Sequence, residues 1–175
     1  MKTVPASQEP PSRAPLAQLE GWDVNPRFRK ILAADVDELF AIRSSVTENP
    51  FSREALAAVG ITPASVTGAL GKTLDGYLAE CSGRIVGFAM ADLKAGELSV
   101  IAVLGQFERR GIGRELLRLT EDLLSSAGFA SIWLWTGNDR STRAFRLYSR
   151  AGWAESEIRD DRLYMKKPMP ERRQR

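Results

Sequence analysis

The sequence predicts a mixed α/β fold built as one domain. Its 175 residues are 43% hydrophobic, which is sufficient for a single domain with a sizeable core. Apolar residues alternate with polar ones in some segments and recur at helical spacing in others, so both strands and helices are predicted. The predicted strands are joined partly by hairpins and partly by helical crossovers, and this combination is typical of a mixed sheet.

Composition divides the chain into three parts. Residues 1–25 are rich in proline and scattered polar residues, which predicts a disordered amino-terminal extension. Residues 26–168 hold the periodic segments of a single domain. Residues 169–175 form a basic carboxy-terminal tail.

Patterns in the first half of the domain predict four strands and three helices. Helix start signals occur at Asp35 and at Thr62-Pro63. The dipeptide Ser82-Gly83 between two apolar runs is a hairpin signal. The predicted elements are a strand at 27–32, helices at 34–46, 52–59 and 61–71, and strands at 76–81, 84–93 and 97–104.

The second half predicts two helices and three strands. Leu116, Leu119 and Leu123 form an apolar stripe along the first of these helices. Gly128 and Gly152 follow the two helices as stop signals. The predicted elements are helices at 114–127 and 141–151, and strands at 129–136, 153–158 and 162–167.

Composition also excludes several classes of function. The net charge is only +3, so no nucleic-acid partner is expected. The chain has no histidine, which excludes Ser-His-Asp catalysis and histidine metal sites, and we expect no metal. No apolar run approaches the roughly 18 residues of a membrane span, and no signal-peptide core is present. With Cys81 as the single cysteine, these features predict a cytoplasmic protein without a membrane partner.

A glycine-rich junction between the strand at 97–104 and the helix at 114–127 is the strongest functional signal. Backbone N–H groups at a helix start are unpaired and favour anions. Gly111 and Gly113 lack a Cβ, so the backbone can approach a phosphate closely. The junction therefore predicts a phosphate or pyrophosphate site, although such glycines can also simply form a turn.

Three stretches together resemble the GNAT superfamily of N-acetyltransferases. The segment VLGQFERRGIG at residues 103–113 resembles the acetyl-CoA loop of that family. The segment RAFRLYSRAGW at residues 143–153 resembles its second signature, and one helix and one strand separate the two. The hairpin GRIVGFA at residues 83–89 resembles the strand pair just upstream. The resemblance covers about residues 27–167.

The resemblance implies a fold and an acyl donor. It implies a GNAT-like, mostly antiparallel mixed sheet with helices on both faces and a V-shaped split between the fourth and fifth strands. It implies an acetyl-CoA-dependent acyltransferase whose donor lies with its pantetheine in the split and its pyrophosphate on the loop. The residues implied to bind the donor are Ile101, Ala102, Val103, Arg109, Arg110, Gly111, Ile112, Gly113, Arg114 and Ser141.

Two positions depart from the family pattern. Placing the pattern Q/R-x-x-G-x-G/A on the glycines puts Glu108 at its first position, where a carboxylate is unfavourable unless it turns away or pairs with Arg109 or Arg110. Ser141 stands where many relatives carry asparagine, and Asn138 lies three residues earlier. Either side chain would hydrogen-bond the pantetheine or cap the helix, and capping is favoured for Ser141.

The expected reaction is attack of a primary amine on a thioester. An alkyl ammonium has a reference pKa of about 10.4, so a base must remove a proton before attack. The resemblance implies that a main-chain N–H near Val103 polarises the carbonyl and that Tyr148 acts as general acid toward the thiolate. Glu97 is a candidate general base, Glu48 is an alternative, and Asp92 is a third candidate; bound water without a dedicated base is also compatible.

Other functions remain open at this stage. A dinucleotide-binding domain would need a third glycine where Leu116 stands. A non-catalytic acetyl-CoA sensor would keep the fold without turnover. Among acceptors, a small-molecule amine is favoured because residues 44–76 are long enough to form a lid. A protein amino terminus or lysine is the alternative, and the enzyme is expected to be a monomer or homodimer.

Overall fold

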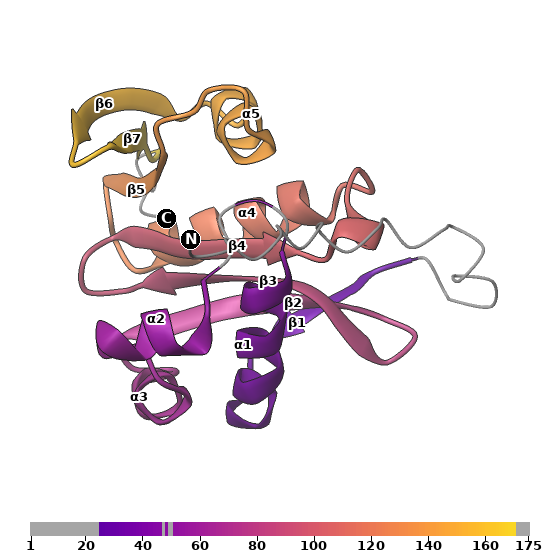
Figure 1. Ribbon diagram of the computed structural model, residues 1–175. Coiled ribbons are helices and arrows are strands. Elements are labelled where there is room, and N and C mark those ends of the chain that lie inside the picture. The colour runs from indigo at the N-terminus through magenta and orange to yellow at the C-terminus, as the bar shows by residue number, and fades with distance from the viewer. Residues whose placement is uncertain (1–24, 47, 49–50, 171–175) are drawn as a thin grey trace, which may run out of the picture.

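The computed structural model describes residues 25–46, 48 and 51–170, and it contains a seven-stranded sheet (Figure 1). The strand order is β1-β2-β3-β4-β5-β7-β6, and all neighbouring strands are antiparallel except the parallel pair β4 and β5. The strands are β1 (Arg27–Lys30), β2 (Leu74–Cys81), β3 (Arg84–Asp92), β4 (Glu97–Val103), β5 (Ser131–Gly137), β6 (Ala154–Arg159) and β7 (Arg162–Pro168).

Five α-helices and two short 3-10 turns connect these strands in the described part of the chain. They are α1 (Val36–Ser45), α2 (Arg53–Ala58), α3 (Pro63–Ala69), α4 (Ile112–Ser126) and α5 (Arg143–Arg150), with 3-10 turns at Ala33–Asp35 and Gly105–Phe107. The predicted mixed α/β class and the predicted order of elements are confirmed. Most of the expected extension at residues 1–25 and most of the expected tail at residues 169–175 lie outside the described residues.

Element boundaries differ from prediction by about two residues at several places, and one of these is the start of α4. The sequence places the helix start at Arg114, whereas α4 begins at Ile112. Gly111 is its N-cap and has a left-handed φ of 79°. A residue with a Cβ avoids this conformation, so the glycine lets the chain turn directly from the loop into the helix.

Helices cover both faces of the amino-terminal half of the sheet. Val36, Leu39 and Phe40 of α1 share a buried cluster with Leu78 and Phe88. On the other face, α4 packs with a second cluster made of Ala79, Cys81, Val86, Ala89, Phe107, Ile112 and Leu116. Alternate residues of β3 therefore enter different clusters, which is expected of a strand buried on both faces.

A core cluster beneath α5 joins the carboxy-terminal half of the sheet to β4 and α4. Ile132 and Leu134 of β5 pack with Leu163 and Met165 of β7, and Tyr148 of α5 belongs to the same cluster. The alternate residues Trp133, Trp135 and Tyr164 point to the opposite face of the sheet.

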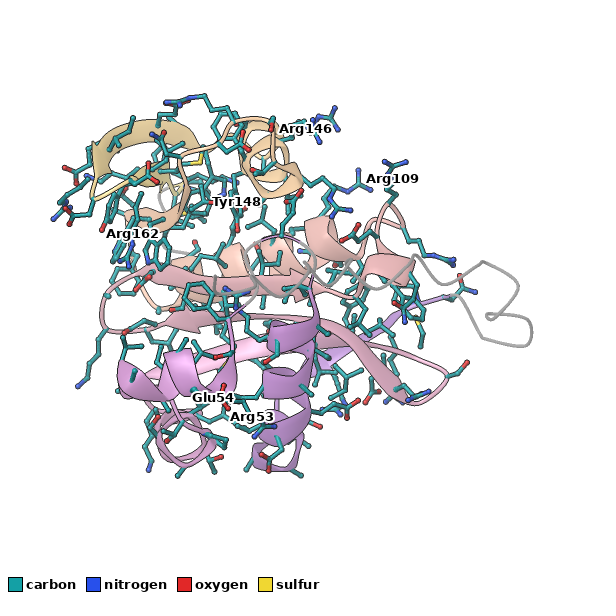
Figure 2. The ribbon with its side chains drawn as sticks, viewed as in Figure 1. Arg53, Glu54, Arg109, Arg146, Tyr148 and Arg162 are labelled. Atoms are coloured by element: carbon teal, nitrogen blue, oxygen red, sulfur yellow. The ribbon has the colours of Figure 1, made fainter. Side chains whose placement is uncertain are left out.

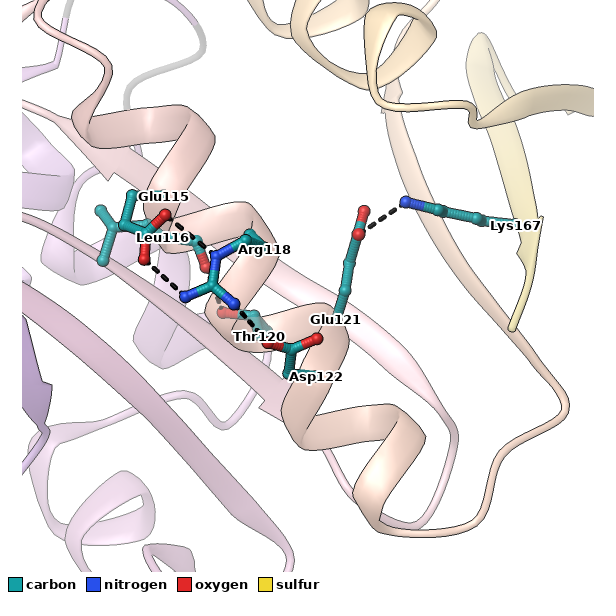
Figure 3. A network of polar contacts seen from close by, with 7 residues as sticks. All are labelled: Glu115, Leu116, Arg118, Thr120, Glu121, Asp122 and Lys167. Carbon is teal, nitrogen blue, oxygen red and sulfur yellow. Dashed lines mark hydrogen bonds and ion pairs between the residues drawn. The ribbon is translucent and has the colours of Figure 1, made fainter. Parts of the chain in front are cut away.

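A buried carboxylate ties α4 to this half of the sheet. Glu121 accepts a hydrogen bond from Lys167 Nζ at 2.6 Å, as Figure 3 shows, and another from Trp153 Nε1 at 2.7 Å. Because the side chain of Glu121 is only 10% exposed, the paired ammonium and indole groups satisfy a charge that would otherwise be costly to bury.

The sheet is divided where β4 meets β5. The two strands share a single registered pair, Glu97 with Trp133, and Trp133 N donates to Gly96 O at 3.1 Å. No further pair follows along these fully described strands, so β4 and β5 diverge toward Val103 and Gly137. This is the V-shaped split that the sequence resemblance implies.

Candidate active site

The side of β4 that faces the split carries backbone N–H groups without a strand partner. Leu104 N donates to Val86 O at 2.9 Å, so Leu104 and Ala102 direct their backbone groups toward β3. The alternation of an antiparallel ladder then directs the N–H groups of Ile101 and Val103 toward β5, which offers them no registered residue. Of the three β4 residues predicted to hold a donor, two thus present hydrogen-bond donors to the split.

The loop after β4 leads into the positive end of α4. Arg109 and Gly111 both have a left-handed φ, 61° and 79°, so the loop turns sharply twice before the helix begins. Arg109 lies at its tip (Figure 2). Arg110 places its guanidinium 5.8 Å from the ring centroid of Phe107, which is fully buried. The loop therefore combines the positive end of a helix with arginine charge, and both favour an anion.

The neighbouring side chains leave room for a Cβ at Gly113. A Cβ built there would lie 3.6 Å from Leu147 Cδ2 and 3.8 Å from Val103 Cγ2, which are ordinary contacts. The fold itself therefore does not require glycine at this position. A glycine at this position is compatible with the close backbone approach that the predicted phosphate site requires.

Tyr148 lies between α5 and the sheet (Figure 2). It is only 6% exposed and packs 6.1 Å from the ring of Trp153. Burial raises the pKa of the Tyr148 hydroxyl, and the charge of Arg43 on α1 opposes this only in part. The hydroxyl is therefore protonated at neutral pH, which is the form that a general acid needs.

Glu97 is half-buried at the start of β4. Its registered partner is Trp133, so the two side chains lie on the same face of the sheet. Burial raises the pKa of the Glu97 carboxyl, and the nearby charge of Asp92 adds to the effect. A raised pKa makes the carboxylate a better proton acceptor than an exposed glutamate.

Glu48 accepts hydrogen bonds from the first backbone N–H groups of α5. Both carboxylate oxygens accept from Arg143 N at 3.0 Å, and one also accepts from Ala144 N at 3.3 Å. Burial alone would raise the pKa of Glu48, but hydrogen bonds from the backbone and side chain of Arg143 outweigh it and leave the pKa below its ordinary value. This geometry suits an anchor for the helix end better than a proton acceptor.

Glu108 has a partner that the sequence does not predict. Its carboxylate forms an ion pair with Arg143 of α5, whereas the sequence suggests Arg109 or Arg110 as its partner. Arg143 is one of several arginines on a short helix and carries no distinguishing sequence signal. Only the convergence of the loop and α5 at the open end of the split brings the two residues together.

The cap of α5 differs from the residue that the sequence predicts. The sequence favours Ser141 as the capping residue, but Thr142 is the N-cap and its Oγ1 accepts from Phe145 N at 3.3 Å. Ser141 N donates to Asp139 Oδ1 at 2.8 Å within the preceding turn, and the exposed Ser141 side chain precedes the helix. The Asn138 amide oxygen accepts from Arg140 Nη1 at 3.2 Å.

An aromatic surface lies on the same face of the sheet as Glu97. Trp133 and Tyr164 stack with ring centroids 6.0 Å apart, and Trp133 Nε1 donates to Ala95 O at 2.9 Å. Arg162 holds its guanidinium 4.2 Å from the ring centroid of Trp135. Stacking on one face of the guanidinium leaves its in-plane N–H groups available for hydrogen bonds.

A polar hollow of about 460 Å³ lies elsewhere, beside α1 and α2. It is lined by Ser44, Ser52, Arg53 and Glu54. In Figure 2, Arg53 and Glu54 lie beside α1 and α2, whereas Tyr148 lies beneath α5. The four lining residues come from α1, α2 and the segment between them, and not from the strands that form the split. None of the helices in the described residues is long and apolar enough to span a membrane.

Comparison with known proteins identifies a family. A model described as the acetyltransferase (GNAT) family matches residues 36–153. No curated protein has a significantly similar sequence.

Several solved structures share the fold. The PaiA N-acetyltransferase of Thermoplasma acidophilum, solved with coenzyme A, has a TM-score of 0.71 and 16% identity over 83% of this chain and 99% of that one. The ribosomal-protein-S18-alanine N-acetyltransferase of Escherichia coli has a TM-score of 0.65 and 20% identity over 86% and 99%. Nourseothricin acetyltransferase has a TM-score of 0.62 and 17% identity over 83% and 99%. At these identities the likeness is one of fold, and the named acceptors include both a protein and a small molecule.

Proposed function

Because the chain belongs to the GNAT family of acetyltransferases, we propose that it transfers the acetyl group of acetyl-CoA to the primary amine of a small molecule. The family makes it an acyltransferase with acetyl-CoA as donor. The observation that carries the proposal is the split between β4 and β5, with the glycine-bordered start of α4 at its open end.

The donor side of the site is built from backbone. We assign the pantetheine to the N–H groups of Ile101 and Val103, and the pyrophosphate to the α4 start at residues 109–114. N–H donors fixed in a strand and a helix end need no rearrangement, so they suit both binding and stabilisation of charge on a carbonyl oxygen. Val103 is the residue we assign to that carbonyl.

Two side chains carry the proton transfers in this proposal. Glu97 accepts a proton from the amine, directly or through water, and Tyr148 donates one to the departing thiolate. Tyr148 packs on the face of β5 formed by Ile132 and Leu134, whereas Glu97 shares the face of Trp133. Glu97 would thus accept the proton of the amine on one face of the sheet, and Tyr148 would donate a proton to the leaving group on the other. Glu48 is less suited to the base role because its oxygens already accept backbone N–H groups.

The surroundings of Glu97 support a small acceptor with a planar or apolar body. Trp133, Trp135 and Tyr164 offer ring surfaces beside the carboxylate, and such surfaces bind flat or apolar groups strongly. Arg162 extends this wall with a stacked cation. A protein amine is the alternative acceptor, since a peptide amino terminus with an apolar first side chain would meet the same surface.

The test is amine-dependent release of coenzyme A, followed with a thiol reagent. The panel compares aromatic, aliphatic and acidic primary amines with short peptides at equal concentration. Turnover with small aromatic amines above that with peptides supports the proposal. Faster turnover with peptides would assign a protein acceptor, and tight acetyl-CoA binding without turnover of any amine would assign a sensor.

A further inference from the structure

We propose that Arg143 is a further ligand of the donor's phosphates, and that donor binding displaces Glu108 from it. Glu48 is the residue that holds Arg143 in place for this exchange. The inference rests on the proposed function, because it needs the donor's phosphates at the start of α4.

The Glu108–Arg143 ion pair spans the open end of the split. Glu108 follows β4 and lies three residues before Gly111, the N-cap of α4. Arg143 follows β5 as the first residue of α5. The pair thus joins the two sides of the split where the strands have diverged, next to the anion-binding helix end. The side chains of Arg143 and Glu108 are only 38% and 22% exposed.

Glu48 fixes the direction in which the guanidinium points. It accepts from Arg143 Nε at 3.1 Å while its oxygens also accept from Arg143 N and Ala144 N. The Nε side of Arg143 is therefore held toward α1, and Nη1 is directed to Glu108 and the loop. Because Glu48 makes backbone as well as side-chain contacts, it can remain in place when Glu108 leaves.

The charges at this point favour an exchange of anions. One guanidinium lies between two carboxylates, so the cluster of Glu48, Glu108 and Arg143 has a net charge of −1. Pyrophosphate brought to the neighbouring helix start would be repelled by Glu108. It would be attracted by Arg143, whose planar fork matches phosphate oxygens better than a single ammonium does.

The strength of the existing pair allows this exchange. Ion pairs that are partly exposed contribute little net stability, because solvent screens the charges and competes for both groups. Phosphate carries more negative charge than a carboxylate and accepts more hydrogen bonds. The donor therefore outcompetes Glu108 for Arg143, and Glu108 lowers the donor affinity that the loop would otherwise have.

The test measures binding of coenzyme A by calorimetry to the full chain and its variants. Arg143→Ala should weaken binding at least about tenfold, as expected for loss of a charge-assisted hydrogen bond. Glu108→Gln should strengthen binding several-fold. Arg146→Ala is the matched control, since Arg146 is an exposed arginine on the same helix, and it should leave binding unchanged. Arg143→Lys, which retains the charge, should fall between wild type and Arg143→Ala.

A phosphate-only probe separates this role from a structural one. Adenosine 3′,5′-bisphosphate carries phosphates but no pantetheine, and Arg143→Ala should weaken its binding by a factor similar to that for coenzyme A. Glu48→Gln should weaken binding of both ligands in wild type and by a smaller factor in the Arg143→Ala background, because the contact of Glu48 with Arg143 Nε is absent there.

Two results would overturn the inference. Equal coenzyme A affinity of Arg143→Ala and Arg146→Ala would show that Arg143 is no phosphate ligand. Unchanged or weaker binding in Glu108→Gln would show that Glu108 does not compete. If the wild-type chain itself does not bind coenzyme A, the proposed function fails instead, so the two failures are distinguishable.

Discussion

Glu97 and Trp133 form the single registered pair between β4 and β5, and their side chains therefore lie on one face of the sheet. Trp133 is anchored by its Nε1 hydrogen bond to Ala95 O at 2.9 Å. The pair fixes the narrow end of the split and places a half-buried carboxylate at that point. This half-buried position favours Glu97 as the proposed base, whereas the oxygens of Glu48 already accept backbone N–H groups of α5.

Replacing Tyr148 tests the general acid. Tyr148→Phe should lower kcat about 100-fold, the usual contribution of a positioned acid, and leave the KM for acetyl-CoA nearly unchanged. Steady-state thiol release measures both constants. Tyr77→Phe is the control, because it removes a hydroxyl from β2, a strand that does not border the split. Wild-type kcat in Tyr148→Phe would remove this role.

Replacing Glu97 tests the base through its pH dependence. Because the pKa of Glu97 is raised, kcat/KM should fall below an apparent pKa that lies above the ordinary range of a glutamate. Glu97→Gln should lower kcat/KM about 100-fold and flatten this acidic limb. Asp92→Asn should move the limb to lower pH, since it removes the neighbouring charge. A limb unchanged in Glu97→Gln would assign it to another group.

Glu97→Gln should also be more stable than the wild-type protein at neutral pH. A carboxyl whose folded pKa is raised above its unfolded value contributes stability that is present at low pH and lost as pH rises through the folded pKa. The ionised Glu97 therefore costs stability at neutral pH, and Glu97→Gln should raise Tm at pH 7 but not at pH 3. Thermal unfolding at the two pH values measures the difference, and a lower Tm at pH 7 would contradict it.

Glycine variants separate the loop's backbone conformation from its ligand contact. Gly113→Ala should reduce coenzyme A affinity at least about tenfold while Tm changes little, because the added Cβ meets only ordinary contacts within the chain. Gly111→Ala should cost about 1 kcal/mol of stability, because its φ of 79° is unfavourable for alanine. Calorimetry and urea unfolding distinguish the two. Normal coenzyme A binding by Gly113→Ala would place the phosphates elsewhere.

Glu121 is expected to matter for stability rather than turnover. Glu121→Ala would leave the Lys167 ammonium and the Trp153 indole N–H without their acceptor, at a cost of about 3 kcal/mol. Urea unfolding measures this cost. Asp122→Ala is the control, since Asp122 pairs with Arg118 on the exposed side of the same helix and should change stability by less than about 1 kcal/mol.

Much of the fold could be predicted because its periodic patterns are strong. The leucine stripe of α4 and the apolar run of β5 define their elements, and Gly128 and Gly152 mark the helix ends. Boundaries are less predictable. Ser141 and Thr142 are adjacent hydroxyl residues, and only the path of the chain decides that Thr142 is the cap.

Some residues of the candidate site could be predicted from the sequence, and some of their contacts could not. The loop at 109–114 and Tyr148 could be proposed from the sequence, because each lies in a short motif that resembles a signature of the family. The link between Glu108 and Arg143 could not be found, because it joins residues 35 positions apart whose approach depends on how two halves of the sheet meet. Glu48 likewise reaches α5 from a loop 95 residues earlier in the sequence.

The divergence of β4 and β5 also means that this sheet has more than its two outer edges. Beyond Glu97 and Trp133, each strand exposes an inner edge with unpaired N–H and C=O groups, which are templates for pairing with another chain. A donor seated in the split would cover these inner edges much as an added strand would. Aggregation during expression should therefore decrease as the supply of coenzyme A increases, so that the ligand protects the protein as well as serving its chemistry.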